Sequence, residues 1–311
     1  MKKETYDIAI IGGGCAGLAS AMYAGRFNMK TLVLSGDLIG GTITLTDTVE
    51  NYPGFKKISG LELAKAIKEH ALEYEIDLKE ETLISVERQK DLFFIKTNEN
   101  KEYYSKTVLF ATGTKFKKLE IKGEDEFLNN GVHYCALCDG FIYKDKVVCV
   151  VGGSDSAAKE ALLLTQYAKK VYIVYRGDKI MPEPINMKRI EKNKKIEIIN
   201  KTNIIQIIGS KNVNKVLLDN LYKGEKELLL DAVFVAVGHI PLSEHAKHLG
   251  VKTNKENEII IDRESKTNIK GVFAAGDVVN TKFKQAIVGV GEGVVGVYSA
   301  YTYVNTKDFI V

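Results

Sequence analysis

The sequence predicts an α/β protein with two Rossmann-like dinucleotide-binding domains, the second inserted into the first. Three observations support this fold class. A strand, a glycine-rich turn, a helix and another strand follow one another near the start, and the same succession returns in the middle of the chain. A closing segment again ends a strand in glycine ahead of a helix. With 311 residues, the chain is long enough for each of two domains to bury a core.

The first unit begins with residues 6–11, an apolar run typical of a buried strand. A glycine turn and a helical run follow, and residues 31–34 form the next strand. In this dinucleotide fingerprint Gly12 makes the tight turn, Gly14 admits a pyrophosphate, and Gly17 lets the helix pack on the strand. The positive end of the helix dipole then faces the phosphates.

The second unit repeats the first. Its strand, residues 147–151, leads into a second glycine turn and a helix. Gly152 follows Gly12 by 140 residues, and Val171 follows Thr31 by the same distance. The repeat therefore indicates two related α/β units, because a solenoid would have a shorter period.

The closing segment predicts how the two domains share the chain. Its strand, residues 272–278, ends in Gly-Asp-Val and precedes a glycine-rich helix, which suits contacts with a dinucleotide. We assign this segment to the first domain. The expected domains are residues 1–116 with 244–311, and an inserted domain of residues 117–243.

Composition excludes several classes of protein. The 44 basic and 40 acidic residues give a net charge of +4, and the lysine-rich runs 115–118 and 192–195 are interpreted as solvated surface rather than a nucleic-acid site. We expect no secretory signal and no membrane span, because no apolar stretch is long enough. Four cysteines are too few for a secreted disulfide scaffold, so we expect a cytoplasmic protein.

The motif Cys135-Ala-Leu-Cys138-Asp139-Gly140 precedes the second unit and carries the clearest chemistry of the chain. Two thiols two residues apart can close a small disulfide ring and open it again. Only a thiolate attacks a disulfide, and a carboxylate directly after the second cysteine can take or return the proton. Exchange through a mixed disulfide then passes electrons to a partner.

The alternative interpretation of this motif is half of a zinc site. Structural zinc takes four ligands, and the sequence offers no second cysteine pair and only His133 nearby, so we expect no metal. Cys149 is predicted to be a buried strand residue, and Cys15 a small packed residue in the phosphate turn.

Taken together, these motifs resemble the low-molecular-weight thioredoxin reductases. The matches span nearly the whole chain in order: residues 12–17, 40–41, 50–54, 111–113, 135–140, the second unit, 276–278 and 284–286. The resemblance implies a homodimer with one FAD per subunit and a redox-active disulfide between Cys135 and Cys138. It implies that Cys138 takes electrons from the flavin, Cys135 attacks the partner's disulfide, and Asp139 acts as acid and base. It also implies a large rotation of the inserted domain.

The resemblance implies FAD contacts from the first domain. The expected residues are Gly12, Gly14, Ala16, Gly17, Ser35, Gly36, Gly41, Thr42, Asn51, Val86, Thr112, Gly113, Gly276, Asp277, Lys284, Gln285 and Ala286. The acidic residue that usually ends the second strand of the fingerprint is absent. The resembled family lacks it too, so its absence does not argue against FAD.

The second dinucleotide site departs from the family. The expected contacts are Gly152, Ser154, Asp155, Ser156 and Arg176. Ser154 stands where a glycine leaves room for the pyrophosphate. NADPH-dependent relatives carry a His-Arg-Arg run and a further arginine that clasp the 2′-phosphate, whereas this chain has the run 175–178, Tyr-Arg-Gly-Asp, and Met181. We therefore expect weak or absent NADPH use.

The sequence thus predicts a flavin-dependent thioredoxin-disulfide reductase that passes electrons from a donor, through FAD, to the cysteine pair and on to a thioredoxin-like protein. Candidate donors are NADH, reduced ferredoxin and a deazaflavin. The alternative is an FAD-dependent dithiol oxidase of the same fold, in which oxygen takes the electrons. A third hypothesis is a redox sensor that only binds partners; the intact pair with its adjacent carboxylate argues against it.

Overall fold

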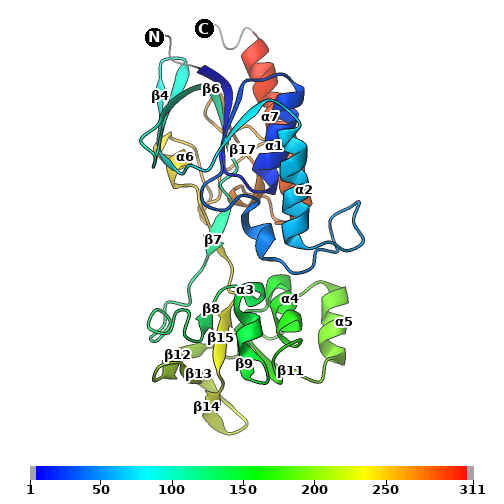
Figure 1. Cartoon of the computed structure of the whole chain (residues 1–311). Helices are drawn as coiled ribbons and strands as arrows, with labels where there is room; N and C mark the ends of the chain where they lie inside the picture. Colours follow the sequence, from blue (N-terminus) through cyan, green and yellow to red (C-terminus); the bar gives the residue numbers. More distant parts are fainter. Residues whose placement is uncertain (1–4, 307–311) are drawn as a thin grey trace. The chain divides into compact units, whose positions relative to one another are not determined.

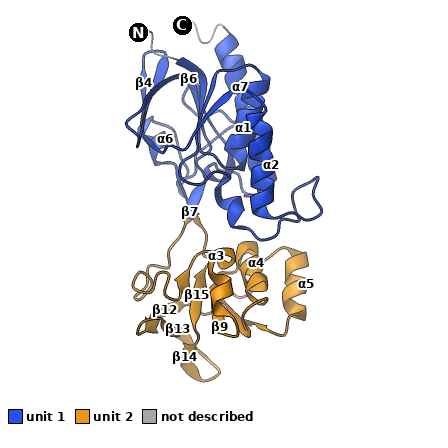
Figure 2. Cartoon of the chain, in the orientation of Figure 1, with its two compact units in different colours: residues 1–115, 240–311 blue, residues 116–239 orange. Residues whose placement is uncertain are grey.

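The computed structural model describes residues 5–306 (Figure 1). The chain divides into two compact units (Figure 2). Unit 1 comprises residues 1–115 and 240–311, and unit 2 comprises residues 116–239. The predicted fold class, two Rossmann-like domains with the second inserted into the first, is therefore confirmed.

The chain passes between the units at β7 (Thr114–Phe116) and β16 (His239–Pro241), which pair with each other as a two-stranded sheet. We expected the second crossing at residues 243/244, whereas the division falls at 239/240. The reason is that Leu242 is bonded within unit 1. Its N–H donates to the Gly113 carbonyl at 3.0 Å, and its carbonyl accepts from Thr112 Oγ1 at 2.7 Å.

Unit 1 is built on a seven-stranded sheet of order β3-β2-β1-β6-β5-β4, with β17 also paired to β6. Strands β3, β2, β1, β6 and β17 run parallel, and β4 and β5 continue the sheet antiparallel. Strands β2 and β17 and the carboxyl-terminal halves of β1 and β6 are apolar because both of their faces are buried, whereas the edge strand β3 is only partly buried. The bounds are β1 (Thr5–Ile11), β2 (Thr31–Leu34), β3 (Ile76–Lys79), β4 (Leu83–Gln89), β5 (Leu92–Thr97), β6 (Glu102–Phe110) and β17 (Val272–Ala274).

Three long helices of unit 1 lie side by side over one face of this sheet (Figure 1). Helix α2 starts with a capping box, in which Ser59 and Glu62 bond each other's backbone N–H groups. The helical bounds are α1 (Cys15–Arg26), η1 (Gly41–Leu45), α2 (Gly60–Leu72), α6 (Glu244–His248), η3 (Gly276–Val278) and α7 (Ala286–Asn305). One core cluster lies between sheet and helices, and another on the face that α6 helps to cover.

Unit 2 has a five-stranded parallel sheet of order β11-β10-β9-β15-β8 and an antiparallel three-stranded sheet β12-β13-β14. Its strands are β8 (Val132–His133), β9 (Val147–Val151), β10 (Lys170–Val174), β11 (Ile196–Ile199), β12 (Ile204–Gly209), β13 (Val213–Tyr222), β14 (Glu225–Leu229) and β15 (Ala232–Val235). Its helices are α3 (Ala136–Asp139), η2 (Gly140–Tyr143), α4 (Asp155–Leu164) and α5 (Pro184–Lys192). Among residues 5–306, no helix is long and apolar enough to cross a membrane.

Candidate redox and dinucleotide sites

The cysteine motif of unit 2 forms a disulfide. Cys135 follows β8 in extended conformation and caps the single-turn helix α3, which brings Cys138 back beside it with the two Cα atoms 5.4 Å apart. The Cys138 N–H donates to Cys135 Sγ at 3.1 Å. Cys138 is exposed and Cys135 half-buried. Once the disulfide opens, this N–H is placed to stabilise a thiolate on Cys135.

The carboxylate of Asp139 lies against a buried histidine that the sequence reasoning considered only as a metal ligand. Asp139 Oδ2 is 3.0 Å from His133 Nδ1, and His133 Nε2 is 2.6 Å from the Tyr143 hydroxyl. Among residues 5–306, no group of three or more His, Cys, Asp or Glu residues is arranged to hold a metal ion. A histidine two residues before the first cysteine was the available signal, and its aromatic partner was not evident from the sequence.

In unit 1 the first glycine turn lies at the carboxyl end of β1, as the parallel sheet requires. A Cβ on Gly12 would lie 2.2 Å from the Ala111 carbonyl oxygen, and one on Gly17 would lie 1.9 Å from the Gly12 carbonyl oxygen, so packing alone demands glycine at both. Gly14 differs, because a Cβ there would meet atoms of its neighbours only at 3.8 Å and beyond.

Gly14 is also the N-cap of α1, and it supplies no side-chain acceptor for the first N–H groups of the helix. Space beside this glycine and uncapped N–H groups together form a cradle for a phosphate. The residues present therefore fit the pyrophosphate of a dinucleotide such as FAD.

Other predicted FAD residues converge on this turn. Gly41, beside Thr42 at the start of η1, lies against Gly14, where a Cβ on Gly41 would be 2.9 Å from the Gly14 Cα. Ser35 lies behind Gly13, with Gly36 next to it in left-handed conformation. Thr112 and Gly113 follow β6, the neighbour of β1 in the sheet.

The closing segment, residues 276–286, also lies beside the first glycine turn, although it comes from the other end of the chain. A Cβ on Gly276 would lie 3.1 Å from the Ala16 Cβ, and the charge of Asp277 acts on Cys15. Asn51 Nδ2 donates to Gln285 Oε1 at 2.9 Å, which joins segments 234 residues apart. Gln285 caps α7 without a side-chain hydrogen bond, so the N–H groups from Ala286 onward form a second open helix end.

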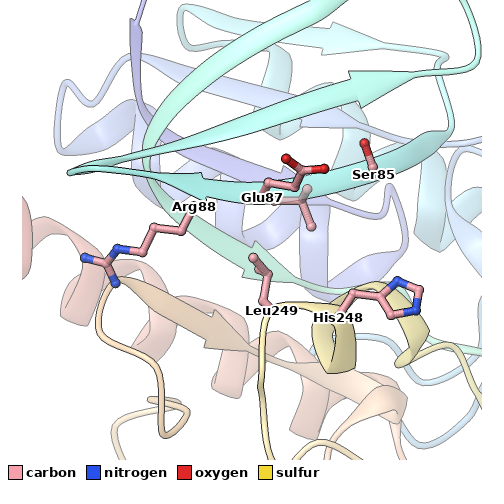
Figure 3. Close-up of a pocket in the computed structure, with 6 residues that line it drawn as sticks. Ser85, Glu87, Arg88, His248 and Leu249 are labelled. Atoms are coloured by element: carbon pink, nitrogen blue, oxygen red, sulfur yellow. The ribbon is translucent and has the colours of Figure 1, made fainter.

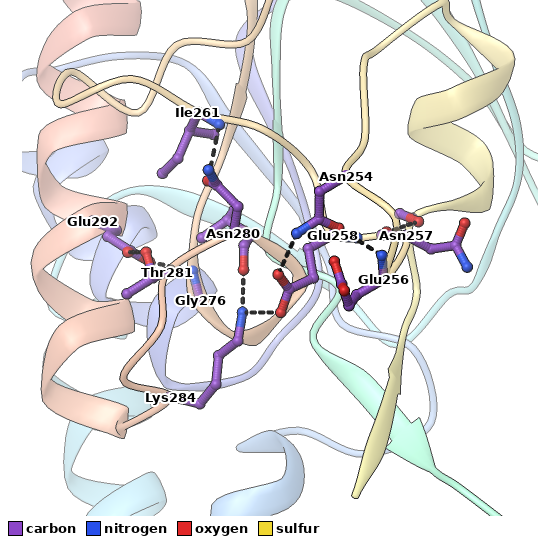
Figure 4. A network of polar contacts seen from close by, with 12 residues as sticks. Asn254, Glu256, Asn257, Glu258, Ile261, Gly276, Asn280, Thr281, Lys284 and Glu292 are labelled. Carbon is purple, nitrogen blue, oxygen red and sulfur yellow. Dashed lines mark hydrogen bonds and ion pairs between the residues drawn. The ribbon is translucent and has the colours of Figure 1, made fainter.

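Two predicted FAD residues have their side chains engaged elsewhere. Lys284 Nζ is 2.8 Å from Glu258 and donates to the Val279 carbonyl, so its ammonium is engaged by groups of unit 1 (Figure 4). Val86 lies in β4 with its side chain buried in the core. Its strand borders a cleft of about 440 Å³ that is also lined by Arg88, His248 and Leu249 (Figure 3).

The two remaining cysteines are unpaired thiols in protected surroundings. Cys15 begins α1, and burial raises its pKa to about 11, with a smaller contribution from Asp277. Cys149 is buried in β9, and burial raises its pKa further above the usual range. Both are therefore protonated and unreactive near neutral pH.

The second glycine turn has a different lining. Ser154 is exposed at the N-cap of α4 and makes no capping hydrogen bond with its side chain. The ring of Tyr175 lies over the turn, because a Cβ on Gly153 would be 2.5 Å from it and a Cβ on Gly177 would be 2.6 Å from it. The ring thus fills the space between the turn and the end of β10.

Asp155, the first residue of α4, ties the start of α5 to this turn. Its carboxylate accepts from the Glu183 N–H at 2.9 Å and from Asn186 Nδ2 at 2.8 Å, and it pairs with Lys159 at 2.8 Å. Burial by itself raises the pKa of Asp155, but these bonds outweigh burial and leave the pKa below its usual value. Ser156 and Arg176, which complete the predicted nicotinamide set with Gly152, are exposed.

The fold and the site define a class of protein: a disulfide oxidoreductase in which a dinucleotide-binding α/β unit accompanies a second unit with a cysteine pair. Residues 6–293 match the family described as pyridine nucleotide-disulphide oxidoreductase. A thioredoxin reductase of Bacillus subtilis is 37% identical over 306 residues, which cover 98% of this chain and 96% of the relative.

Comparison with solved structures indicates the same class of protein. The thioredoxin reductase of Lactococcus lactis in its FR conformation has a TM-score of 0.92 at 37% identity, covering 96% of this chain and 99% of that one. A ferredoxin-flavin thioredoxin reductase of Clostridium acetobutylicum has a TM-score of 0.54 at 32% identity, covering 97% and 98%. The chain belongs to the pyridine nucleotide-disulphide oxidoreductase family, among the low-molecular-weight thioredoxin reductases, and is an oxidoreductase. The resemblance read from the motifs is confirmed.

Proposed function

We propose that this protein is a flavin-dependent thioredoxin-disulfide reductase that works as a homodimer in a reducing compartment such as the cytoplasm. The observation that carries the proposal is the closed Cys135–Cys138 disulfide with Asp139 directly after it, in a chain that matches thioredoxin reductases over nearly its full length. FAD, when bound, supplies a two-electron carrier between a donor and this disulfide.

The residues of unit 1 hold that cofactor. The uncapped N–H groups of α1 and the space beside Gly14 receive the pyrophosphate. The Gly276-Asp277 turn and the open start of α7 approach the same turn, and the bond between Asn51 and Gln285 fixes their positions. Two glycine-lined helix ends that face one ligand suit a molecule with two phosphates.

In the reduced protein, the pair carries out thiol–disulfide exchange. The Cys135 thiolate attacks one sulfur of the partner's disulfide, and the other partner sulfur leaves and takes up a proton. Asp139 then accepts the thiol proton of Cys138, whose sulfur attacks Cys135 Sγ and releases the partner's second sulfur. The partner gains two electrons and two protons, and the Cys135–Cys138 disulfide is restored.

A protein partner fits the surface next to the pair. Phe141 and Ile142 follow Asp139-Gly140 directly, and 61% and 57% of their surfaces are exposed. Two large apolar side chains exposed in succession beside a reactive disulfide favour a docked protein over a small thiol. A thioredoxin-like protein, which presents its own cysteine pair, is the partner that we propose.

For the electron donor, we propose a source other than NADPH. Tyr175 covers the glycine turn at which a nicotinamide dinucleotide binds, and Ser154 replaces its middle glycine. Arg176 and Lys179 are the basic residues of segment 175–181, and Asp178 pairs with Lys201 at 3.1 Å. A 2′-phosphate therefore lacks the arginine clasp that it prefers. NADH, reduced ferredoxin and a deazaflavin are the candidates, and one solved relative is a ferredoxin-flavin thioredoxin reductase.

An anaerobic donor screen that follows flavin absorbance tests this proposal. We expect a ferredoxin or a deazaflavin to bleach the flavin much faster than micromolar NADPH. NADH, which lacks the 2′-phosphate but needs the same covered turn, should act more slowly than these two donors. Reduction of thioredoxin should then accompany bleaching and stop in Cys138→Ser, which keeps its FAD. Rapid and complete reduction by micromolar NADPH would overturn the donor proposal.

A gain-of-function variant tests whether the residues of the second glycine turn cause the weak use of NADPH. Ser154→Gly with Gly177→Arg should improve NADPH use, but a side chain at 177 meets the Tyr175 ring, so Tyr175→His belongs in the same variant. The matched control carries Tyr175→His alone. If the triple variant uses NADPH no better than this control, the changes at the second glycine turn are not the cause.

The covered glycine turn also favours a second candidate, an FAD-dependent dithiol oxidase that passes electrons to oxygen. The two functions differ in direction. Peroxide formed from dithiols, with no reduction of thioredoxin by any donor, would establish the oxidase. Donor-dependent reduction of thioredoxin without peroxide would exclude it.

A further inference from the structure

Three polar side chains, Asp139, His133 and Tyr143, form a chain that leads from the Cys135–Cys138 disulfide into the interior of unit 2. His133, at the end of β8, has 2% of its side-chain surface exposed. One ring nitrogen faces the Asp139 carboxylate at 3.0 Å and the other faces the Tyr143 hydroxyl at 2.6 Å. The imidazole is held between these groups by stacking on the Phe234 ring, at 5.3 Å between centroids.

The number of protons on the imidazole and the carboxylate determines which group donates and which accepts in each contact of this chain. Burial lowers the pKa of His133, and the nearby Asp139 carboxylate offsets this only in part, so the imidazole is neutral at neutral pH and carries one N–H. An ionised carboxylate only accepts hydrogen bonds. Nδ1 of His133 is buried and, among residues 5–306, has no partner in full hydrogen-bond geometry. The Asp139 carboxylate, 3.0 Å away, is the acceptor within reach of its proton.

The tyrosine completes the assignment. With the proton on Nδ1, Nε2 of His133 is an acceptor, and the Tyr143 hydroxyl must donate to it. Burial, together with the charges of Asp139 and Asp231, raises the pKa of Tyr143 to about 12, so its hydroxyl keeps its proton. The order is therefore Tyr143 O–H to His133 Nε2, and His133 Nδ1–H to Asp139 Oδ2.

We propose that His133 is a positioning residue for thiol–disulfide exchange: its Nδ1–H holds one oxygen of Asp139, and Tyr143 selects the tautomer that supplies this hydrogen. This inference rests on the proposed function and deepens it. With Oδ2 held, Oδ1 is the oxygen left to receive the Cys138 thiol proton and to return it to a leaving sulfur. His133 and Tyr143 keep their own protons throughout.

The test uses a reaction that needs neither the electron donor nor thioredoxin. Purified oxidised protein, with its flavin bound, is mixed with dithiothreitol, quenched with an alkylating reagent and analysed by mass spectrometry for labelled Cys135 and Cys138. Dithiothreitol is oxidised to its cyclic disulfide as both cysteines become thiols, so electrons and protons balance. The rate measures the exchange step that Asp139 assists.

Substitutions of His133 by asparagine and by glutamine show which of its two ring nitrogens the exchange step requires. Asparagine places an amide N–H near the position of Nδ1, whereas glutamine reaches the position of Nε2. We expect His133→Asn to stay within about 3-fold of the wild-type rate, and His133→Gln and His133→Phe to fall about 10-fold. Asp139→Asn should fall about 100-fold, the lower end of general acid–base contributions. Phenylalanine preserves the stacking on Phe234, and circular dichroism checks each fold.

A double variant distinguishes positioning from a structural role. In the Asp139→Asn background, His133→Phe should change the rate less than 2-fold, because its effect passes through the carboxylate. An equal 10-fold loss in both backgrounds, a wild-type rate for His133→Phe, or equal losses for His133→Asn and His133→Gln would each overturn the inference. If the protein reduces no thioredoxin but these rates follow the expected order, the proposed function fails and the role of His133 stands.

Discussion

Replacing Gly14 by alanine tests whether this glycine is needed for FAD binding or for folding. The added Cβ would lie 3.8 Å from the Gly41 Cα and 3.9 Å from the Gly40 carbonyl oxygen, which are ordinary contacts. The backbone is extended there, at φ −77°, which alanine adopts freely. A weaker N-cap costs about 0.5–1 kcal/mol, and the stiffer unfolded chain recovers about 0.4–1 kcal/mol. The free energy of unfolding should therefore change by less than about 1 kcal/mol.

Binding of FAD should respond far more strongly. A methyl group at this position occupies the approach of the pyrophosphate to the α1 N–H groups. Loss of one charge-assisted hydrogen bond weakens binding by about 1.5–3 kcal/mol, which corresponds to a Kd increase of about 10- to 150-fold. The assay is titration of apoprotein with FAD, followed by quenching of flavin fluorescence, beside thermal unfolding of the same apoprotein.

Two matched variants complete the experiment. Gly17→Ala places a Cβ 1.9 Å from the Gly12 carbonyl oxygen and should destabilise the apoprotein itself by at least 1–3 kcal/mol. Gly291→Ala adds a methyl group to the exposed side of α7, with no atom within 4 Å, and should leave both quantities nearly unchanged. An unchanged Kd in Gly14→Ala would refute the assignment of this turn to FAD.

Burial raises the pKa of Glu160 to about 8. Its contribution to stability is therefore full below the unfolded pKa near 4.5 and is lost as pH rises toward 8. At about 1.4 kcal/mol per pKa unit, Glu160→Gln should gain up to about 4 kcal/mol over wild type between pH 4 and pH 8 in urea unfolding. Ser59→Ala should lower the unfolding free energy by about 1 kcal/mol, whereas Ser59→Thr should not. Phe141→Ser with Ile142→Ser should raise the KM for thioredoxin about 10-fold and leave reduction by dithiothreitol unchanged; equal effects on both reactions would contradict docking at this surface.

The sequence predicted the elements whose residues carry a local signal. Both glycine turns, the strands that flank them and the helices α1 and α4 that follow them lie where the pattern indicated. Strands buried on both faces are continuous apolar runs, and glycines forced by close backbone contacts stand out. The closing helix extends to Asn305, well beyond the glycine-rich start that was recognised.

Other features depend on contacts that a linear pattern does not display. Lys284 lies in a segment typical of flavin contact, yet its partner Glu258 lies in an irregular loop. Ser154 was expected to crowd the second turn, whereas the residue that covers it is Tyr175, whose ring folds back over two glycines. The meander β12–β14 also escaped prediction, because its strands are only partly buried and alternate weakly.

The protonated state of the Cys15 and Cys149 thiols affects which cysteines of the protein can be oxidised during turnover. A dithiol that exchanges with partners also meets peroxides and mixed disulfides, and it can pass oxidation to any reactive thiolate nearby. Both spare thiols remain protonated at neutral pH, one with its pKa near 11 and the other sealed inside β9. Thiol–disulfide exchange is thereby directed to the Cys135–Cys138 pair, and a disulfide formed there is reopened by the next round of reduction.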